Sequence, residues 1–176
     1  MRLNEVFYVV LSVLFISSCA SVTHWTDFEE GRSFNDYRTY KIDEQCSDYN
    51  PGINPIQQQR IKNAIELELR SMGYEKAEAA DLNIKFFVKN ETKYFYEECL
   101  PEYDEFTGGQ RCIERVHTYE EGTLVIDFID ISDNLAVWHG GASGEPWERM
   151  NNASQKITKM VRAIIGDYKK LVERDS

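Results

Sequence analysis

The sequence predicts a two-layer α+β domain, in which a mainly antiparallel sheet of about four strands carries two helices on one face. Two kinds of pattern support this prediction. Several segments alternate apolar and polar residues, as strands with one buried side do. Two longer segments repeat apolar residues every three or four positions, as amphipathic helices do. The elements follow in the order strand, helix, three strands, helix, and the hairpin connections between the last strands imply antiparallel pairing.

The first strand and the first helix are expected in the first half of the domain. The strand is expected around Tyr37–Ile42, where aromatic residues stand among polar ones and Ile42 ends the run. A loop with a Pro-Gly turn signal follows. The helix is expected at 55–72, because Asn54 and Gln57 have the spacing of a capping box at its start. Gly73 suits the position after its last turn.

Three further strands and a long helix are expected in the second half. The strands are predicted at 82–88, 122–131 and 135–142, with a Ser-Asp-Asn turn between the last two. The final helix follows Asn152, which repeats the capping-box spacing with Gln155. Its apolar face comprises Ile157, Met160, Val161, Ile164, Tyr168 and Leu171.

Length and composition fit one globular domain with a targeting segment. The chain has 176 residues, of which 42% are hydrophobic and 28% are charged, so a packed core is expected rather than disorder. The formal net charge is -10. This charge argues against a nucleic-acid-binding surface and against electrostatic adhesion to anionic lipid headgroups.

The amino-terminal segment is typical of an export signal. Val6–Ile16 is an apolar run of eleven residues with one serine. That is the length of the apolar part of a signal peptide, whereas about 20 residues are needed to span a bilayer. The run ends in Ile16-Ser17-Ser18-Cys19, which resembles a bacterial lipobox. The resemblance implies cleavage before Cys19 and acylation of Cys19, which would anchor the chain in a membrane.

These features divide the chain into three parts. Residues 1–18 are expected to be a lipoprotein signal peptide, 19–33 the lipidated cysteine with a short tether, and 34–176 a single α+β domain. Ala20 stands where an aspartate would retain a lipoprotein in the inner membrane, so the resemblance implies the outer membrane. No acidic run follows, which favours its periplasmic face. The alternative is a soluble secreted protein with a chance cysteine.

The other three cysteines would lie in an oxidising compartment. Cys99 and Cys112 flank one loop, and closing a loop of that size would stabilise the fold by about 3 kcal/mol. We favour this disulfide on proximity alone. Cys46 is then free, or it pairs with one of the two and frees the other. No CxxC spacing supports a metal site, and neither a metal nor a cofactor is expected.

Residues 94–121 are rich in acidic and aromatic side chains. Two functional interpretations are a calcium site and a docking loop for a basic partner. The spacing of an EF-hand is absent. The simpler interpretation, which we favour, is a solvated hairpin extension whose aromatic residues cover the edge of the sheet.

Several stretches together resemble one protein family. GTLVIDFIDISDNLAVWHGGASG, at 122–144, is similar to the signature region of domain-of-unknown-function family 4136. Residues 60–88 resemble its first helix and following strand, and residues 36–40 its first strand. Members are typically bacterial envelope lipoproteins, so the resemblance implies both the fold and the compartment. It implies no catalytic residues, since none is established for the family, and 94–121 do not match the family pattern.

Asp127 and His139 are the candidate pair for a polar surface site. They lie on neighbouring predicted strands, and a His–Asp pairing depends on a register that the sequence does not specify. A solvated surface pair is the simpler interpretation. The sequence contains no short catalytic signature, so we expect no enzyme.

The sequence therefore predicts a non-enzymatic binding or adaptor module of the cell envelope. It would contact the membrane through its lipid and would bind an envelope protein, and it would not bind nucleic acid. One alternative is an envelope hydrolase without a short motif, with Asp127 and His139 as its site. The other is a carrier of a small apolar ligand, which requires a cavity between helices and sheet.

Overall fold

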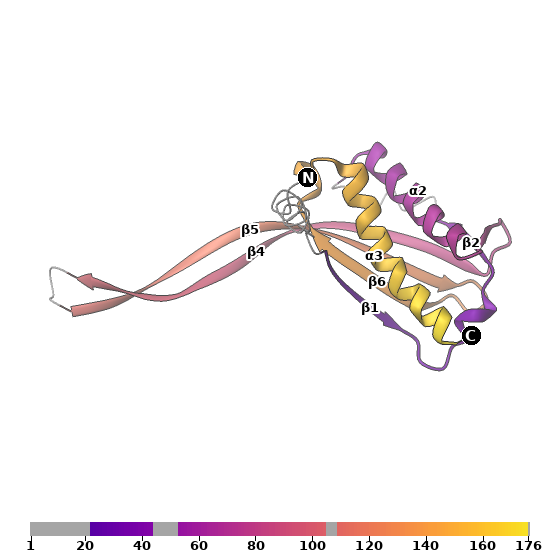
Figure 1. The fold of residues 1–176 in the computed structure, drawn as a ribbon, viewed down its shortest axis with the longest axis horizontal. Coiled ribbons are helices and arrows are strands. Elements are labelled where there is room, and N and C mark those ends of the chain that lie inside the picture. Colours follow the sequence, from indigo (N-terminus) through magenta and orange to yellow (C-terminus); the bar gives the residue numbers. More distant parts are fainter. Residues whose placement is uncertain (1–21, 44–52, 105–108, 176) are drawn as a thin grey trace, which may run out of the picture.

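The computed structural model describes residues 22–43, 53–104 and 109–175, with the backbone alone at 96–104 and 109–115. These residues form a body and a long two-stranded arm that projects from it (Figure 1). In the body, two long helices lie side by side on one face of a six-stranded sheet. Within the described residues, no helix is both long enough and apolar enough to cross a membrane.

The sheet is mixed, with strand order β1-β6-β5-β4-β2-β3. Neighbouring strands from β1 to β4 pair antiparallel, whereas β2 pairs in parallel with both β4 and β3. The elements in chain order are β1 (Thr23–Phe28), η1 (Phe34–Asp36), β2 (Thr39–Ile42), α2 (Pro55–Ser71), β3 (Glu75–Lys76), β4 (Leu82–Asp104), β5 (Gly109–Asp130), β6 (Leu135–Gly144), η3 (Trp147–Arg149) and α3 (Ala153–Arg174).

The predicted α+β class is confirmed, but the prediction of about four strands is too low. Strand β3 has two residues and gives no recognisable pattern. Strand β1 lies within 19–33, the segment expected to be a tether, so the folded part begins before residue 34. All residues of β1 except the last are exposed, because β1 is an edge strand, and its mixed polar sequence therefore does not indicate a half-buried strand.

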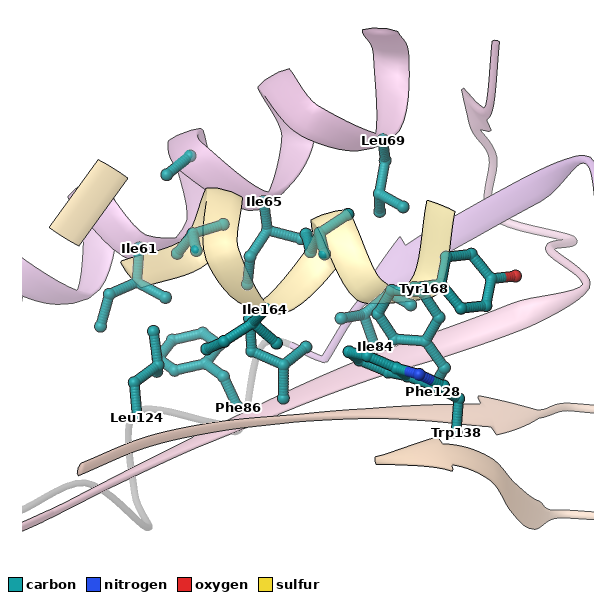
Figure 2. Close-up of a cluster of buried hydrophobic side chains, with 14 of the residues drawn as sticks. Ile61, Ile65, Leu69, Ile84, Phe86, Leu124, Phe128, Trp138, Ile164 and Tyr168 are labelled. Atoms are coloured by element: carbon teal, nitrogen blue, oxygen red, sulfur yellow. The ribbon is translucent and has the colours of Figure 1, made fainter. Parts of the chain in front are cut away.

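The hydrophobic core lies between the sheet and the two helices (Figure 2). Tyr168 of α3 is fully buried at its centre, with ring centroids 4.5 Å from Phe128 and 5.4 Å from Trp138. Its hydroxyl lies 2.8 Å from that of Tyr74, which satisfies both buried groups. Burial raises the pKa of Tyr168, so it stays neutral. Other fully buried members include Ile61, Ile65, Leu69, Leu82, Ile84, Phe86, Leu124, Ile126, Val161 and Ile164.

The two helices begin differently. Asn54 and Gln57 form the predicted capping box of α2, with distances of 2.9 and 3.1 Å between side-chain oxygens and backbone nitrogens. At its other end, Gly73 has a φ of 87°, as a glycine-terminated helix requires. The matching prediction for α3 is wrong. Asn152 has a left-handed backbone, so its side chain does not cap; its carbonyl accepts from Gln155 and Lys156 instead.

Candidate functional site

The candidate pair Asp127 and His139 is brought together on the sheet face opposite the helices. The two residues are direct partners in the register of β5 and β6, and His139 Nδ1 lies 2.5 Å from Asp127 Oδ1. On one side Asp27 of β1 is opposite His139, and on the other Lys85 of β4 is opposite Asp127. The pair thus belongs to a row of ionisable residues that crosses four strands.

The pair of Asp127 and His139 resembles a surface pair more than a catalytic dyad. The His139 side chain is 46% exposed, and that of Asp127 is 21% exposed. Such exposure gives high dielectric screening and little control over water, both of which weaken acid–base catalysis. The geometry therefore favours the simpler interpretation of the pair.

An aromatic row runs beside this ionic row on the same open face. Trp25 of β1 is opposite Gly141 of β6, which is opposite Val125 of β5, which is opposite Phe87 of β4. A Cβ atom at Gly141 would lie 2.3 Å from the Trp25 ring, so glycine is needed for the tryptophan to pack directly against the strand. Trp25 remains 40% exposed, whereas Trp138 and Trp147 are 1% exposed. Sequence reasoning missed this surface.

The predicted hairpin extension at 94–121 is confirmed as the distal part of β4 and β5. We call residues 91–104 and 109–121 the arm. Its strands pair from Glu91 opposite Glu121 to Asp104 opposite Gly109, with a register shift between Glu97 and Leu100. At roughly 3.3 Å per residue, the fourteen residues of its first strand span about 45 Å.

The described aromatic side chains of the arm do not cover the sheet edge as expected. Beyond its root, where Arg149 of η3 contacts Glu120, the arm extends away from the body (Figure 1). Tyr94, Phe95 and Tyr119 are 63%, 57% and 53% exposed, and Val116 is 53% exposed. Large apolar side chains exposed together on a narrow ribbon are typical of a contact surface.

The root of the arm is held by Trp147, which is buried in η3 just after β6. Its backbone nitrogen donates to Asn90 Oδ1 at 3.1 Å, and its indole nitrogen donates to the Thr123 carbonyl at 3.3 Å. Its carbonyl accepts from Gln57 of α2 at 2.9 Å. Gly122 fits beneath it, since a Cβ there would lie 2.6 Å from the Glu145 carbonyl. The arm therefore leaves the body from a fixed joint.

Charged side chains around the root neutralise one another. Glu91 contacts both Lys89 and Lys93, and the distance from Lys93 Nζ to Glu121 is 3.9 Å. Hydrogen bonds and charge from the two lysines lower the pKa of Glu91 to about 2, so it is ionised at neutral pH. Two lysines and two glutamates make a local net charge of zero.

The cysteine predictions stay untested. Cys99 and Cys112 lie on facing strands of the arm, where Cys112 is opposite Pro101. Their side chains lie outside what the structure describes. Cys19 and Cys46 fall in ranges that are not described at all.

Asp130 is a buried carboxylate among the described residues and lies at the far end of the sheet from the arm. It accepts hydrogen bonds from Tyr37 Oη at 2.9 Å, from Arg32 at 3.1 Å and from Ser132 Oγ at 2.7 Å. Burial alone would raise the pKa of Asp130, but these hydrogen bonds and the charge of Arg32 outweigh it and lower the pKa. Burial and the bond to Asp130 raise the pKa of Tyr37 to about 12. All these groups are satisfied by one another, which indicates a structural role.

A cleft on the helix side of the sheet edge does not suit an apolar ligand. It has a volume of about 650 Å³ and lies between β2, β3 and α2. Its lining includes Lys41, Asp43, Lys62, Glu66 and Lys76. Ligand pockets for apolar molecules are lined mainly by hydrophobic side chains, so this cleft offers no support for a carrier. Among the described residues, no three His, Cys, Asp or Glu side chains are grouped to hold a metal ion.

Comparisons with known proteins agree on the fold. A family model described as "Domain of unknown function (DUF4136)" matches residues 25–168, as the motifs predicted. A DUF4136 family protein from Bacteroides thetaiotaomicron VPI-5482 is 13% identical with a TM-score of 0.51, covering 86% of this chain and 97% of that one. A PDZ domain protein from Parabacteroides distasonis ATCC 8503 is 17% identical with a TM-score of 0.51, covering 84% of this chain.

The second of these proteins is much longer, and the chain spans about a third of it, 35%. At identities this low, both likenesses show the fold alone. No curated protein matches the chain.

Proposed function

Because the chain belongs to the DUF4136 family, which is defined without an activity, we propose a function from its own surfaces. The protein is a non-enzymatic adaptor of the bacterial envelope, anchored through lipid on Cys19 to the periplasmic face of the outer membrane. It presents its arm to a protein partner. The lipobox-like Ile16-Ser17-Ser18-Cys19 supports the anchor, and the arm is the observation that supports the adaptor role.

Energetics explain why such an arm suggests a partner. A two-stranded hairpin is marginally stable by itself, because neither face is buried against a third element. Exposed side chains such as Tyr94 and Val116 add a further cost in water and favour association. The fixed joint at Trp147 limits the entropy lost when the arm binds.

The charge of the arm indicates the chemistry of the partner. Residues 91–121 contain nine Asp or Glu and three Lys or Arg, so 3 − 9 gives a net charge of −6. This is most of the net charge of -10 carried by the whole chain. A partner with a basic surface would be attracted to the arm and oriented by it.

The experiment compares the full chain with an armless variant in cells. Replacing residues 94–118 by Asn-Gly would join Lys93 to Tyr119, which already face each other. Both chains carry a carboxy-terminal tag, and partners are captured by in-cell crosslinking and identified by mass spectrometry. We expect one dominant partner with the full chain and its loss from the armless variant.

Two controls make the comparison decisive. Thermal unfolding should show the armless body still folded, since the joint residues Asn90 and Trp147 remain. A Cys19→Ala variant should also lose the partner, because the chain is no longer held at the membrane. If a folded armless body captures the same partner as the full chain, the arm is not the binding element and the proposal is wrong.

A further inference from the structure

The chain enters the sheet at the same end from which the arm leaves it. β1 begins at Thr23, which is opposite Ser143 of β6, and Ser143 is opposite Thr123 of β5. Thr123 in turn is opposite Lys89, two residues before the arm begins on β4. One row across four strands therefore joins the start of the folded chain to the root of the arm.

The tether to the proposed anchor is very short. Three residues lie between Cys19 and Thr23. Even a fully extended chain covers at most 3.6 Å per residue, so the two Cα atoms are no more than about 14 Å apart. A lipid on Cys19 would hold that residue at the bilayer surface. The end of the sheet that carries Thr23 must then lie next to the lipid headgroups.

The open face at this end carries aromatic side chains. Trp25 lies two residues beyond Thr23, in one row with the partly exposed Phe87. Side chains alternate along a strand, so Phe95 and Tyr119 of the arm are on the continuation of the same face. Tryptophan and tyrosine favour the membrane–water interface, because a large apolar ring carries a polar group that stays in contact with water.

The charges of this surface suit a neutral lipid layer. Lys89, Glu91, Lys93 and Glu121 point to the same face by their alternation and neutralise one another. The row that contains Asp27, Asp127 and Lys85 has more carboxylates than lysines. It lies two residues farther from the anchor than the row of Trp25. An electrically balanced aromatic surface neither needs anionic headgroups nor is repelled by zwitterionic ones.

We propose that the open sheet face around Trp25 lies against the headgroup layer of the bilayer that holds the lipid anchor. The part of the arm next to its root, from Glu91 to Phe95 and from Tyr119 to Glu121, lies against the same layer. This inference rests on the lipid anchor of the proposed function. It also sets the direction of the arm. The arm continues β4 and β5 of this face, so it leaves the body along the membrane plane, and its acidic outer part stays in water.

Tryptophan fluorescence tests this contact directly. Trp25 is the exposed tryptophan, and the other two are buried. The full lipidated chain is reconstituted in phosphatidylcholine vesicles, with or without bromine atoms on the lipid acyl chains near the headgroup. We expect a blue shift and a loss of the Trp25 emission with brominated lipid, and no such loss in a Trp25→Phe variant. Accessibility of Trp25 to aqueous iodide should fall in parallel.

Each other outcome has a definite meaning. Mass spectrometry of the amino-terminal peptide first establishes whether Cys19 is acylated. An acylated chain whose Trp25 is not quenched by brominated lipid overturns the docking and leaves the anchor intact. A Trp25 shielded from iodide but not quenched by lipid would show that protein covers the face, which also overturns the docking. A chain without lipid overturns both proposals.

Discussion

Gly122 and Trp147 illustrate how single residues position the arm. The indole ring occupies the space where a side chain at residue 122 would lie, and its nitrogen donates to the carbonyl of the next residue, Thr123. Asn90 satisfies the backbone nitrogen of Trp147 across 57 positions in sequence. These contacts join residues far apart in the chain, and no local pattern predicts them.

A Gly122→Ala substitution should therefore destabilise the protein. Its Cβ would meet the Glu145 backbone oxygen at 2.6 Å, and a backbone atom moves less readily than a side chain. We expect a loss of about 1–3 kcal/mol in the free energy of unfolding, measured by urea denaturation. Gly166→Ala is the matched control, because nothing lies within 4 Å of a Cβ there. In the middle of α3 it should stabilise by about 0.5–1 kcal/mol. Equal effects of the two substitutions would contradict the proposed fit.

Asp130 links stability to pH. Its lowered pKa means that the folded state favours the ionised carboxylate. The resulting stability is present above the ordinary Asp pKa of about 3.9 and is lost as pH falls through the lower folded value. Asp130→Asn removes a charged acceptor of Arg32, which keeps Asp133 as a partner, so it should cost about 1–2 kcal/mol at pH 7.

The difference between wild type and Asp130→Asn should then shrink as pH falls below about 4, because the wild-type carboxyl becomes protonated too. Urea unfolding of both proteins at pH 7 and near pH 3 measures this change. Other carboxylates titrate equally in both proteins and cancel in the difference. A difference that stays constant with pH would show that the charge of Asp130 does not contribute.

At the scale of elements, the helices and strands with a regular spacing of apolar residues were predicted from the sequence. Those without such a spacing were missed. α2 and α3 each bury one stripe of side chains, so their apolar spacing identifies them. The inner parts of β4, β5 and β6 bury one face against those helices and were predicted for the same reason. In the arm, the described side chains of Tyr94, Phe95 and Val116 are exposed on both faces of the ribbon, so this part lacks the alternation that marks a half-buried strand. The edge strand β1 was missed because its residues are largely exposed.

The ends of the helices give a test at this scale. Asn54→Ala removes the side-chain acceptor for the Gln57 amide and should lower the free energy of unfolding by about 1 kcal/mol. Asn152→Gly is the contrasting substitution, since Asn152 does not cap and has a φ of 54°, which glycine adopts more easily. It should leave stability unchanged or raise it slightly. Chemical denaturation of the three proteins distinguishes these expectations, and a comparable loss at Asn152 would argue that both residues cap.

At the scale of the whole molecule, function depends on surfaces that need the complete sheet. The sequence identified Asp127 and His139, but their contact follows from the register of β5 and β6, which only the assembled sheet defines. Trp25 and Gly141 belong to strands separated by most of the chain, so the open aromatic face had no local signal. The arm was foreseen as a hairpin, while its projection was not, because the direction of a ribbon depends on its joint.

The adaptor role predicts that the ionic row is dispensable. Asp127→Asn combined with His139→Gln keeps both side chains polar and of similar size but makes neither of them ionisable. We expect the double variant to capture the same partner as the wild type, at the same level, in the crosslinking experiment described above. A cellular defect in a folded double variant would instead favour the hydrolase alternative. Circular dichroism confirms that both proteins are folded before they are compared.

Because the joint at Trp147 is fixed, the length of the arm can change during evolution without a change in the body. The contacts of Trp147 end at the root, so residues added beyond it meet only the facing strand. Each inserted pair, one residue per strand, lengthens the ribbon by about 3.3 Å, and two pairs restore the original facing of every side chain. Relatives could thus differ in arm length by insertions and deletions of two residues in each strand, four in total, without any compensating change in the core. Selection on the length of the arm could therefore adjust the distance between the anchor and the partner independently of the stability of the fold.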